Sequence, residues 1–367
     1  DLADPFILCF RVIIATISKP AEPMKIQPFE TEHFFARHEF EARWQLCNSD
    51  CESITIEELL SLSGSNSSAL AAEKLSYTES QGCNVLREAI AAMHGHPPAD
   101  DVVVLGTPVE GIYLAARALL EPGDEVVVLT PAYDALSNLF EHIVGTGKVK
   151  KWHFSAGKEQ WELHLDELRR LLTPRTRLVV VNFPHNPTGY LPSPQMQQEL
   201  VTLVEQNDLH LFCDEMYFGL VHDGTPPVPS AVTLSDRVVV LSGLSKTHGL
   251  PGLRCGWLMV PDQELRENIM NWKFYTSICP PVPTEFLACR ALEVWELLRD
   301  QNLARIARNL EIAEQFFTSW PALFHWRQPL AGSTALVEFR VPSVSALSER
   351  LANTESILIQ SAAMLGG

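Results

Sequence analysis

The chain has 367 residues, of which 46% are hydrophobic and 20% charged, and its formal net charge is -17 at pH 7. This length allows a large hydrophobic core and more than one domain. The acidic balance argues against a nucleic-acid partner, because neutralising phosphates takes clustered Lys and Arg, and the sequence has no such run. We therefore expect a small-molecule partner.

The N-terminal stretch FILCFRVIIATI is apolar but shorter than the roughly 20 residues that a membrane helix needs. Asp1 and Asp4 precede it, where a signal peptide has basic residues. The first methionine is Met24, so we expect residues 1–23 to be an upstream extension or, alternatively, a disordered or docking arm. The eight cysteines form no CxxC pair, which favours reduced thiols, a cytoplasmic location and no metal site. We expect no membrane association.

Apolar strands alternate with helical patterns along most of the chain. This alternation indicates an α/β fold with a mostly parallel sheet that is covered by helices on both faces. Following a helical pattern at the end of 73–95, the expected elements are strand 101–105, helix 109–120, strand 124–129, helix 130–144, strand 176–183, helix 195–206, strand 209–215 and strand 237–243.

Unusual polar stretches follow these strands, at the edge where parallel sheets bind ligands. The first, LGTPVEGIYLAARAL, opens a helix, and free N–H groups at a helix start bind anions such as phosphate. Val109 and Glu110 would offer amides and Thr107 a hydroxyl. An ordinary helix start explains this stretch equally well.

The second stretch, NFPHNPTGY, is rich in turn-forming residues. Asn186 lies between His185 and Pro187, so a stiff loop would direct its side chain toward a ligand. A structural turn is the alternative, and we interpret His185 as a packing or loop residue.

The third stretch, CDEMYFG, places Asp214 and Glu215 at the end of an apolar strand, with Tyr217 three residues after Asp214. A carboxylate in that position is costly unless a cation accompanies it. We interpret Glu215 as solvated or salt-bridged, and Asp214 as a functional candidate.

The fourth stretch is LSGLSKTHGLPGLRCGW, in which Lys246 follows Ser245 directly after a strand. A neutral lysine amine can attack a carbonyl carbon and form a Schiff base. Arg254, eight residues later, could hold a phosphate through two hydrogen bonds.

In this order, NPTG, DEMY and SKTHGLPGLRCGW resemble the motifs of fold-type I pyridoxal-phosphate enzymes, specifically the class I and II aminotransferases. The resemblance runs from Tyr77 to the C-terminus, and the motif sequences are most similar to the branch that includes capreomycidine synthase. It implies a large domain with a mostly parallel sheet flanked by helices, a smaller α+β domain built from both chain ends, and a homodimer. The implied divisions are an N-terminal arm of the small domain (24–60), a large cofactor-binding domain (61–275) and a C-terminal small domain that looks truncated (276–367).

The resemblance also implies a role for each motif residue around pyridoxal phosphate. Lys246 would form the Schiff base and move a proton, while Asp214 would pair with the pyridinium nitrogen. Tyr217 and Asn186 would bond to the ring oxygen, and Tyr133 would stack on the ring.

The phosphate would be surrounded by Val109, Glu110, Ser245 and Arg254. Tyr77 matches a tyrosine that reaches the phosphate of the neighbouring subunit, although ordinary packing would also explain it.

The sequence departs from the family pattern at three places. Gly243 stands where a phosphate-binding Ser or Thr is usual, so we expect either that Ser242 compensates for it or that the affinity for the cofactor is lower. In the N-terminal region, Asn48, Ser49 and Asp50 would contact the substrate, or Ser53 would simply cap a helix that begins near residue 54. We favour the cap.

The third departure is the arginine that binds the substrate carboxylate, since the stretch that carries it does not follow ILIQSAAMLGG. The candidates to replace it are Arg37, Arg43 and Arg340. We also expect loose packing near Gly366.

These features predict an aminotransferase that moves an amino group between an amino acid and a 2-oxo acid through Lys246. The alternatives are a pyridoxal-phosphate lyase or cyclase of the capreomycidine synthase type and a non-catalytic protein on the same fold. A nicotinamide-dependent dehydrogenase is disfavoured because LGTPVEG lacks the G-x-G-x-x-G pattern.

Overall fold

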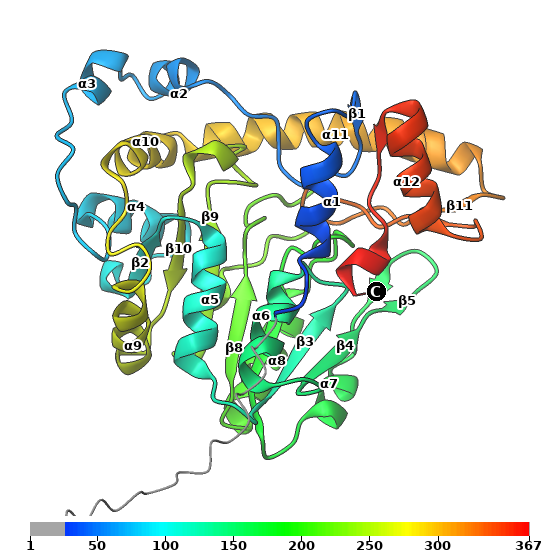
Figure 1. The fold of residues 1–367 in the computed structure, drawn as a ribbon, viewed down its shortest axis with the longest axis horizontal. Helices are drawn as coiled ribbons and strands as arrows, with labels where there is room; N and C mark the ends of the chain where they lie inside the picture. Colours follow the sequence, from blue (N-terminus) through cyan, green and yellow to red (C-terminus); the bar gives the residue numbers. More distant parts are fainter. Residues whose placement is uncertain (1–25, 367) are drawn as a thin grey trace, which may run out of the picture.

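The computed structural model describes residues 26–366, so the expected extension at 1–23 lies outside the described residues. The centre of the described part is a seven-stranded sheet in the order β2-β10-β9-β8-β7-β3-β4, in which β10 alone runs antiparallel to its neighbours (Figure 1). The strands are β2 (Val102–Leu105), β3 (Glu125–Thr130), β4 (Val149–His153), β7 (Thr176–Asn182), β8 (His210–Asp214), β9 (Val238–Gly243) and β10 (Gly256–Met259).

The mostly parallel sheet and all five expected strands are confirmed. Every residue of β2, β3 and β9 is buried, because helices cover both faces of the sheet. The strands β4 and β10 were not expected. The sequence of β4, VKKWH, is largely polar because it forms a half-exposed edge strand, and β10 has only four residues.

Two hydrophobic clusters fill the space between the sheet and its helices. One face is covered by α5 (Pro108–Leu119), α6 (Ala135–Val144) and α9 (Gln263–Lys273). The other is covered by α2 (Ile56–Leu62), α4 (Asn84–Met93), α7 (Leu165–Leu171), α8 (Pro194–Gln206), α10 (Val282–Glu293) and the start of α11 (Trp295–Ser319).

The expected helix at 130–144 begins later than predicted, at Ala135. Thr130 is still the last residue of β3, and the residues between them form a turn. By contrast, α5 starts at Pro108, where a missing N–H group costs nothing because the first helical amides have no partner in the helix.

The two ends of the described chain meet beside the large sheet. β1 (Trp44–Gln45) pairs in parallel with β13 (Ile357–Leu358), next to α1 (Glu30–His38) and α12 (Val344–Glu355) (Figure 1). The remaining short elements are α3 (Ser67–Ala71), β5 (Ser155–Ala156), β6 (Trp161–Glu162), β11 (Phe324–His325) and β12 (Glu338–Phe339). This pairing agrees with a small domain built from both ends, and the division at 24–60, 61–275 and 276–367 stays a prediction.

Packing near Gly366 is closer than the sequence suggested. Leu365 is buried, and its carbonyl accepts a hydrogen bond from the Ala132 amide at 2.9 Å. The carbonyl of Gly366 accepts one from the Lys151 ammonium at 3.0 Å. Both contacts join the last described turn to residues around the large sheet.

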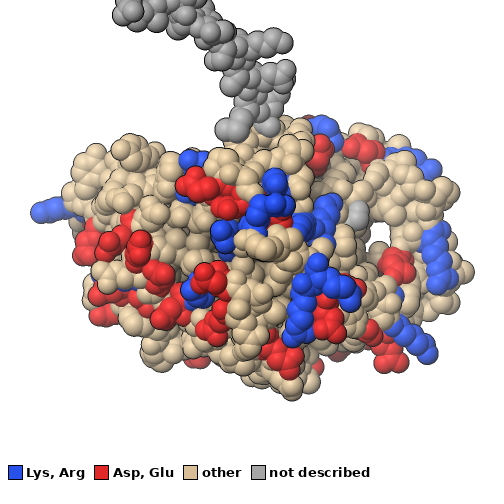
Figure 2. All heavy atoms as spheres, turned by 90° about the horizontal axis from the view of Figure 1, so that it is seen from below, with Lys and Arg blue, Asp and Glu red and all other residues tan. Residues whose placement is uncertain are grey.

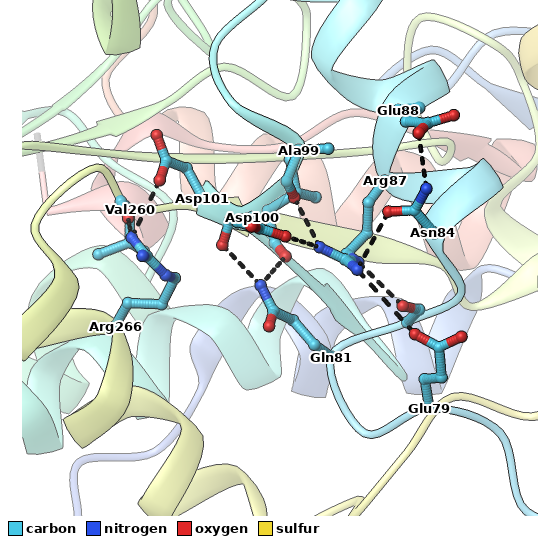
Figure 3. Close-up of polar contacts among 12 residues, drawn as sticks. Glu79, Gln81, Asn84, Arg87, Glu88, Ala99, Asp100, Asp101, Val260 and Arg266 are labelled. Atoms are coloured by element: carbon cyan, nitrogen blue, oxygen red, sulfur yellow. Dashed lines mark hydrogen bonds and ion pairs between the residues drawn. The ribbon is translucent and has the colours of Figure 1, made fainter.

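Two arginines fix the segment that leads into β2 (Figure 3). Arg87 of α4 donates to the Gly82 carbonyl at 3.0 Å and to the Asp100 carboxylate at 2.8 Å. Arg266 of α9 donates to the Asp101 carboxylate at 3.0 Å. Arg87 therefore joins α4 to the segment before β2, and Arg266 joins α9 to the same segment.

Acidic and basic side chains are mixed over the face shown in Figure 2. Within residues 26–366, no helix combines the length and the apolar character that crossing a bilayer requires. The cytoplasmic location stays a prediction.

Candidate active site

The carboxyl ends of three neighbouring strands bring the candidate residues together. Asn182 ends β7, Asp214 ends β8, and Lys246 follows Gly243, the last residue of β9. The Asn182 side chain donates to the Asp214 carbonyl at 2.8 Å, and its oxygen accepts the Asn186 amide at 2.7 Å. Asn182 was missed from the sequence, although it is a polar residue that ends an apolar strand.

Asp214 is a buried carboxyl group whose Oδ1 accepts the Met216 amide at 3.0 Å. Burial raises its pKa from 3.8 to about 7, while that hydrogen bond and the charge of Lys246 act in the opposite direction. The ionised carboxylate is therefore costly here, and a cation placed directly against it would lower that cost.

Lys246 contacts the N-terminal segment at Ser49 and Asp50. Its ammonium donates to the Ser49 hydroxyl at 2.8 Å and lies 3.5 Å from an oxygen of Asp50. Burial raises the phenol pKa of the adjacent Tyr217, and the interaction with the Ser49 hydroxyl lowers it. Ser333 donates to the Ser49 carbonyl and so holds this segment in place.

Further carboxylates gather on the same side of Lys246. Tyr133 donates its hydroxyl hydrogen to Glu32 at 2.7 Å. Burial raises the pKa of Glu39, the charges of Asp50 and Glu32 raise it further, and the charge of Lys246 lowers it. This region of the site is therefore net negative.

The start of α5 lies against the ends of β9 and β10, close to Arg254. The Arg254 guanidinium donates to the Thr107 hydroxyl at 2.6 Å, and its backbone adopts a left-handed conformation with φ of 50°. A Cβ added at Gly243 would lie 3.1 Å from Pro108, so the helix start packs directly on this strand end. Ser245 is buried immediately beyond it. A guanidinium and a helix N-terminus thus adjoin, which suits an anion.

Glu110 is placed less favourably for binding an anion. Its amide donates to the Thr107 carbonyl at 3.1 Å, and its carboxylate accepts hydrogen bonds from the Gly106 amide and the Thr276 hydroxyl. Val109 is therefore the better candidate for a free amide at this helix start.

Comparison with known proteins shows which family the chain belongs to. The sequence profile of the aminotransferase class I and II family matches residues 59–365. The chain belongs to this family.

Two relatives show the range of reactions among similar proteins. The chain is 32% identical to the capreomycidine synthase of Streptomyces vinaceus, over 92% of this chain and 87% of that protein. It is 30% identical to the arginine–pyruvate transaminase AruH of Pseudomonas aeruginosa, over 79% of this chain and 75% of that protein.

The solved structures agree with this assignment. A pyridoxal-phosphate-dependent aminotransferase from Streptococcus suis superposes with a TM-score of 0.86 at 25% identity, covering 93% of this chain and 91% of that one. The pyridoxal-phosphate-dependent cyclase OrfR also has a TM-score of 0.86, at 27% identity, covering 95% of this chain and 92% of that one. The cofactor is therefore pyridoxal phosphate.

The residues at the strand ends fit this cofactor. Asp214 is buried without a close ion pair to Lys246, whose ammonium is bonded to Ser49 instead, and a protonated ring nitrogen would supply the missing cation. Arg254 and the start of α5 would receive the phosphate.

The structure explains why this family member has glycine at 243. A Cβ there would lie 2.8 Å from the Cys255 carbonyl oxygen, so a side chain does not fit without movement of the backbone. Compensation by Ser242 does not agree with the structure, because its hydroxyl donates to the Glu215 carbonyl at 3.1 Å. The other alternative, a lower affinity for the cofactor, stays a prediction.

The interpretation of the N-terminal region is also corrected. Ser53 does not cap α2. Thr55 does so, in a capping box with Glu58. The less favoured alternative, a substrate contact by Asn48, Ser49 and Asp50, stays a prediction. Ser49 and Asp50 contact Lys246, whereas the Asn48 side chain donates to Gln45.

Glu215 is not solvated. It is buried, its Oε1 accepts the Ala231 amide at 2.7 Å, and its Oε2 lies 3.5 Å from the His94 ring nitrogen. The solvated alternative is therefore wrong, whereas a salt bridge with His94 requires a protonated imidazole and stays a prediction.

The three arginines expected to replace the family's carboxylate-binding residue make their described contacts elsewhere. Arg37 pairs with Glu349 at 3.1 Å, and Arg43 lies 5.0 Å above the Trp44 ring. Arg340 donates to the Pro321 carbonyl at 3.2 Å. None of these contacts involves Lys246 or Asp214.

Proposed function

We propose that the chain is a pyridoxal-phosphate-dependent aminotransferase that moves an amino group between an amino acid and a 2-oxo acid. The observation that carries the proposal is the meeting of Lys246 with buried Asp214 at the ends of neighbouring strands. When bound, the cofactor supplies an electron sink for the carbanion left at the substrate α-carbon.

The protein residues would divide the remaining work. Lys246 would bond to the cofactor and carry a proton to and from the α-carbon, and Ser49 would orient its amine. Asp214 would hold the proton on the ring nitrogen. Asn186 and Tyr217 would bond to the ring oxygen.

The outer residues would fix the position of the cofactor. Tyr133 would lie on the ring face. The residues proposed for the phosphate are Val109, Glu110, Ser245, Arg254 and, from the neighbouring subunit, Tyr77.

The substrate that we propose is an amino acid with a cationic side chain. Glu32, Glu39 and Asp50 make the region beside Lys246 negative, which favours a guanidinium or an ammonium group. The name of the arginine–pyruvate transaminase among the relatives supports the same class. A matched test compares arginine with citrulline, which has a similar shape but no charge. We expect a higher kcat/KM for arginine, and equal values would contradict this assignment.

A second candidate is cyclisation of a basic amino acid. The similarity of the chain to capreomycidine synthase and to the cyclase OrfR favours this candidate. Both reactions begin with removal of the α-proton. With arginine and pyruvate, transamination produces one alanine for each arginine consumed, while cyclisation consumes the amino acid without forming alanine. Exchange of the α-proton with deuterated water reports the shared step. If no amino acid tested exchanged its α-proton, only the non-catalytic alternative would remain.

We also propose that the protein is a homodimer. Leu75, Tyr77 and Tyr275 are exposed by 84%, 85% and 88%, and exposed large apolar side chains are typical of interfaces. Thr78 donates to the Pro280 carbonyl at 2.8 Å, so the segment after Tyr77 contacts the segment after Tyr275.

A further inference from the structure

Two cysteines far apart in the sequence lie side by side outside the candidate active site. Cys83 directly precedes α4, and Cys289 lies on α10. The Cys83 amide donates to Glu285 at 2.8 Å, and Glu285 is one helical turn before Cys289, so both face the start of α4. The thiols of Cys83 and Cys289 are close enough for each to shift the pKa of the other.

The surroundings of Cys83 favour a thiolate. Its sulfur adjoins the Cys289 thiol and the start of α4 near Leu86, where helix amides stabilise negative charge. The interactions with Cys289 and with the Leu86 amide lower the pKa of Cys83 to about 7, although burial and the carboxylates of Glu285 and Glu79 act in the opposite direction. The interaction with Cys83 raises the pKa of Cys289.

A cavity adjoins both cysteines. The two cysteines are half-buried and line a cavity of about 600 Å³ between α10 and the segment 65–78. Lys74 and Arg290 line it together with Glu73 and Glu285, so it offers partners for both charges of a zwitterionic peptide.

Four other cysteines are less suited to reaction with a disulfide. Cys213 and Cys255 are buried, and burial raises the pKa of each thiol. Cys47 and Cys51 are half-buried, and burial raises their pKa values to about 12 and about 11. Cys83 is therefore favoured over these four as the reactive thiol.

We propose that Cys83 and Cys289 form a dithiol site that a low-molecular-weight disulfide, such as oxidised glutathione, converts to an intramolecular disulfide. The Cys83 thiolate attacks one sulfur of the reagent, and the reagent's disulfide breaks to give a mixed disulfide and one free thiolate. Cys289 then loses its proton to solvent and attacks the Cys83 sulfur, which releases the second thiolate. Two protein thiols are oxidised and one reagent disulfide is reduced.

The test treats the cofactor-loaded protein with oxidised and reduced glutathione at several ratios, followed by non-reducing peptide mapping by mass spectrometry. We expect a Cys83–Cys289 cross-linked peptide that dithiothreitol reverses. Cys289→Ser should stop at a glutathione adduct on Cys83, and Cys83→Ser should leave Cys289 unmodified. Cys279→Ser, at a half-buried cysteine elsewhere, is the matched control and should cross-link like the unsubstituted protein. No cross-link at the most oxidising ratio would overturn the proposal.

A second readout follows alkylation of Cys83 by iodoacetamide against pH and requires no oxidation. Half-maximal reactivity is expected near pH 7 in the unsubstituted protein. In Cys289→Ser the pH of half-maximal reactivity should move toward about 8.5, the ordinary pKa of a thiol, unless the serine hydroxyl restores the interaction with Cys83. Cys289→Ala removes that hydroxyl, and an unchanged profile in this variant would show that Cys289 does not activate Cys83.

Discussion

At the scale of single residues, Lys246 is the test of the proposed chemistry. Replacing it with alanine removes both the covalent attachment of the cofactor and the amine that carries the proton. We expect turnover to fall roughly 10²–10⁴-fold or more, since this is the usual contribution of a general acid–base group. Borohydride reduction followed by peptide mapping should label Lys246 in the unsubstituted protein. A label on another lysine would contradict the assignment.

The raised pKa of the buried Asp214 predicts an effect on stability as well as on catalysis. Its pKa is about 7 in the folded protein and 3.8 in the unfolded chain, so between these values the folded state binds more protons. The free energy of unfolding of the cofactor-free protein should therefore fall as pH rises from about 4 to 7, by up to about 4 kcal/mol from this group.

Asp214→Asn isolates this contribution, because asparagine does not titrate and other acids affect both proteins equally. Urea unfolding across this pH range should show that the variant gains stability relative to the unsubstituted protein as pH rises. Parallel curves would mean that Asp214 is not kept neutral by burial. The cofactor should reduce the difference, since its ring nitrogen would supply a cation.

At the scale of elements, the sequence was informative where a single periodicity dominates. Continuous apolar runs predicted β2, β3 and β9 because both faces of the sheet are covered. The edge strand β4 was missed because it is half polar, and the start of α6 was misplaced because the turn after Thr130 separates it from β3. These features depend on neighbours, which no local pattern contains.

The contact between α5 and β9 can be tested at Gly243. Gly243→Ala places a Cβ 2.8 Å from the Cys255 carbonyl oxygen and 3.1 Å from Pro108, so the helix start must move. We expect a loss of about 1–3 kcal/mol in the free energy of unfolding, measured by urea denaturation, and weaker binding of the cofactor phosphate.

Gly252→Ala is the matched control, because nothing lies within 4 Å of a Cβ at that position. Its free energy of unfolding should stay within about 0.5 kcal/mol of the original. If both variants behave alike, the packing at Gly243 does not constrain the helix.

At the scale of the whole molecule, the candidate site combines residues that the sequence could and could not indicate. Asp214, Asn186 and Lys246 stood out because each is a polar residue at or shortly after the end of an apolar strand. Ser49 was named only in the less favoured alternative of a substrate contact, and its contact with Lys246 could not be foreseen because the two segments are almost two hundred residues apart. Folding brings the N-terminal segment over the sheet edge, and only the three-dimensional structure shows that.

Assembly is the remaining prediction at this scale. Tyr77 is 85% exposed, so within its own subunit it is free to reach the phosphate site of a partner. Light scattering should give twice the mass of the chain at assay concentration. Tyr77→Phe should weaken cofactor binding roughly tenfold or more, because it removes a hydrogen bond to a charged group.

Hybrid dimers decide which subunit supplies the tyrosine. In a hybrid of Tyr77→Phe with Lys246→Ala, the one site that keeps Lys246 receives an intact Tyr77 from its partner, so its cofactor affinity should be normal. In a second hybrid, the unsubstituted chain is paired with a chain that carries both Tyr77→Phe and Lys246→Ala. Here the site that keeps Lys246 receives phenylalanine from its partner, and its cofactor affinity should fall as in the Tyr77→Phe homodimer. The opposite pattern would place Tyr77 in its own subunit's site, and equal affinities in both hybrids would remove it from the phosphate site altogether.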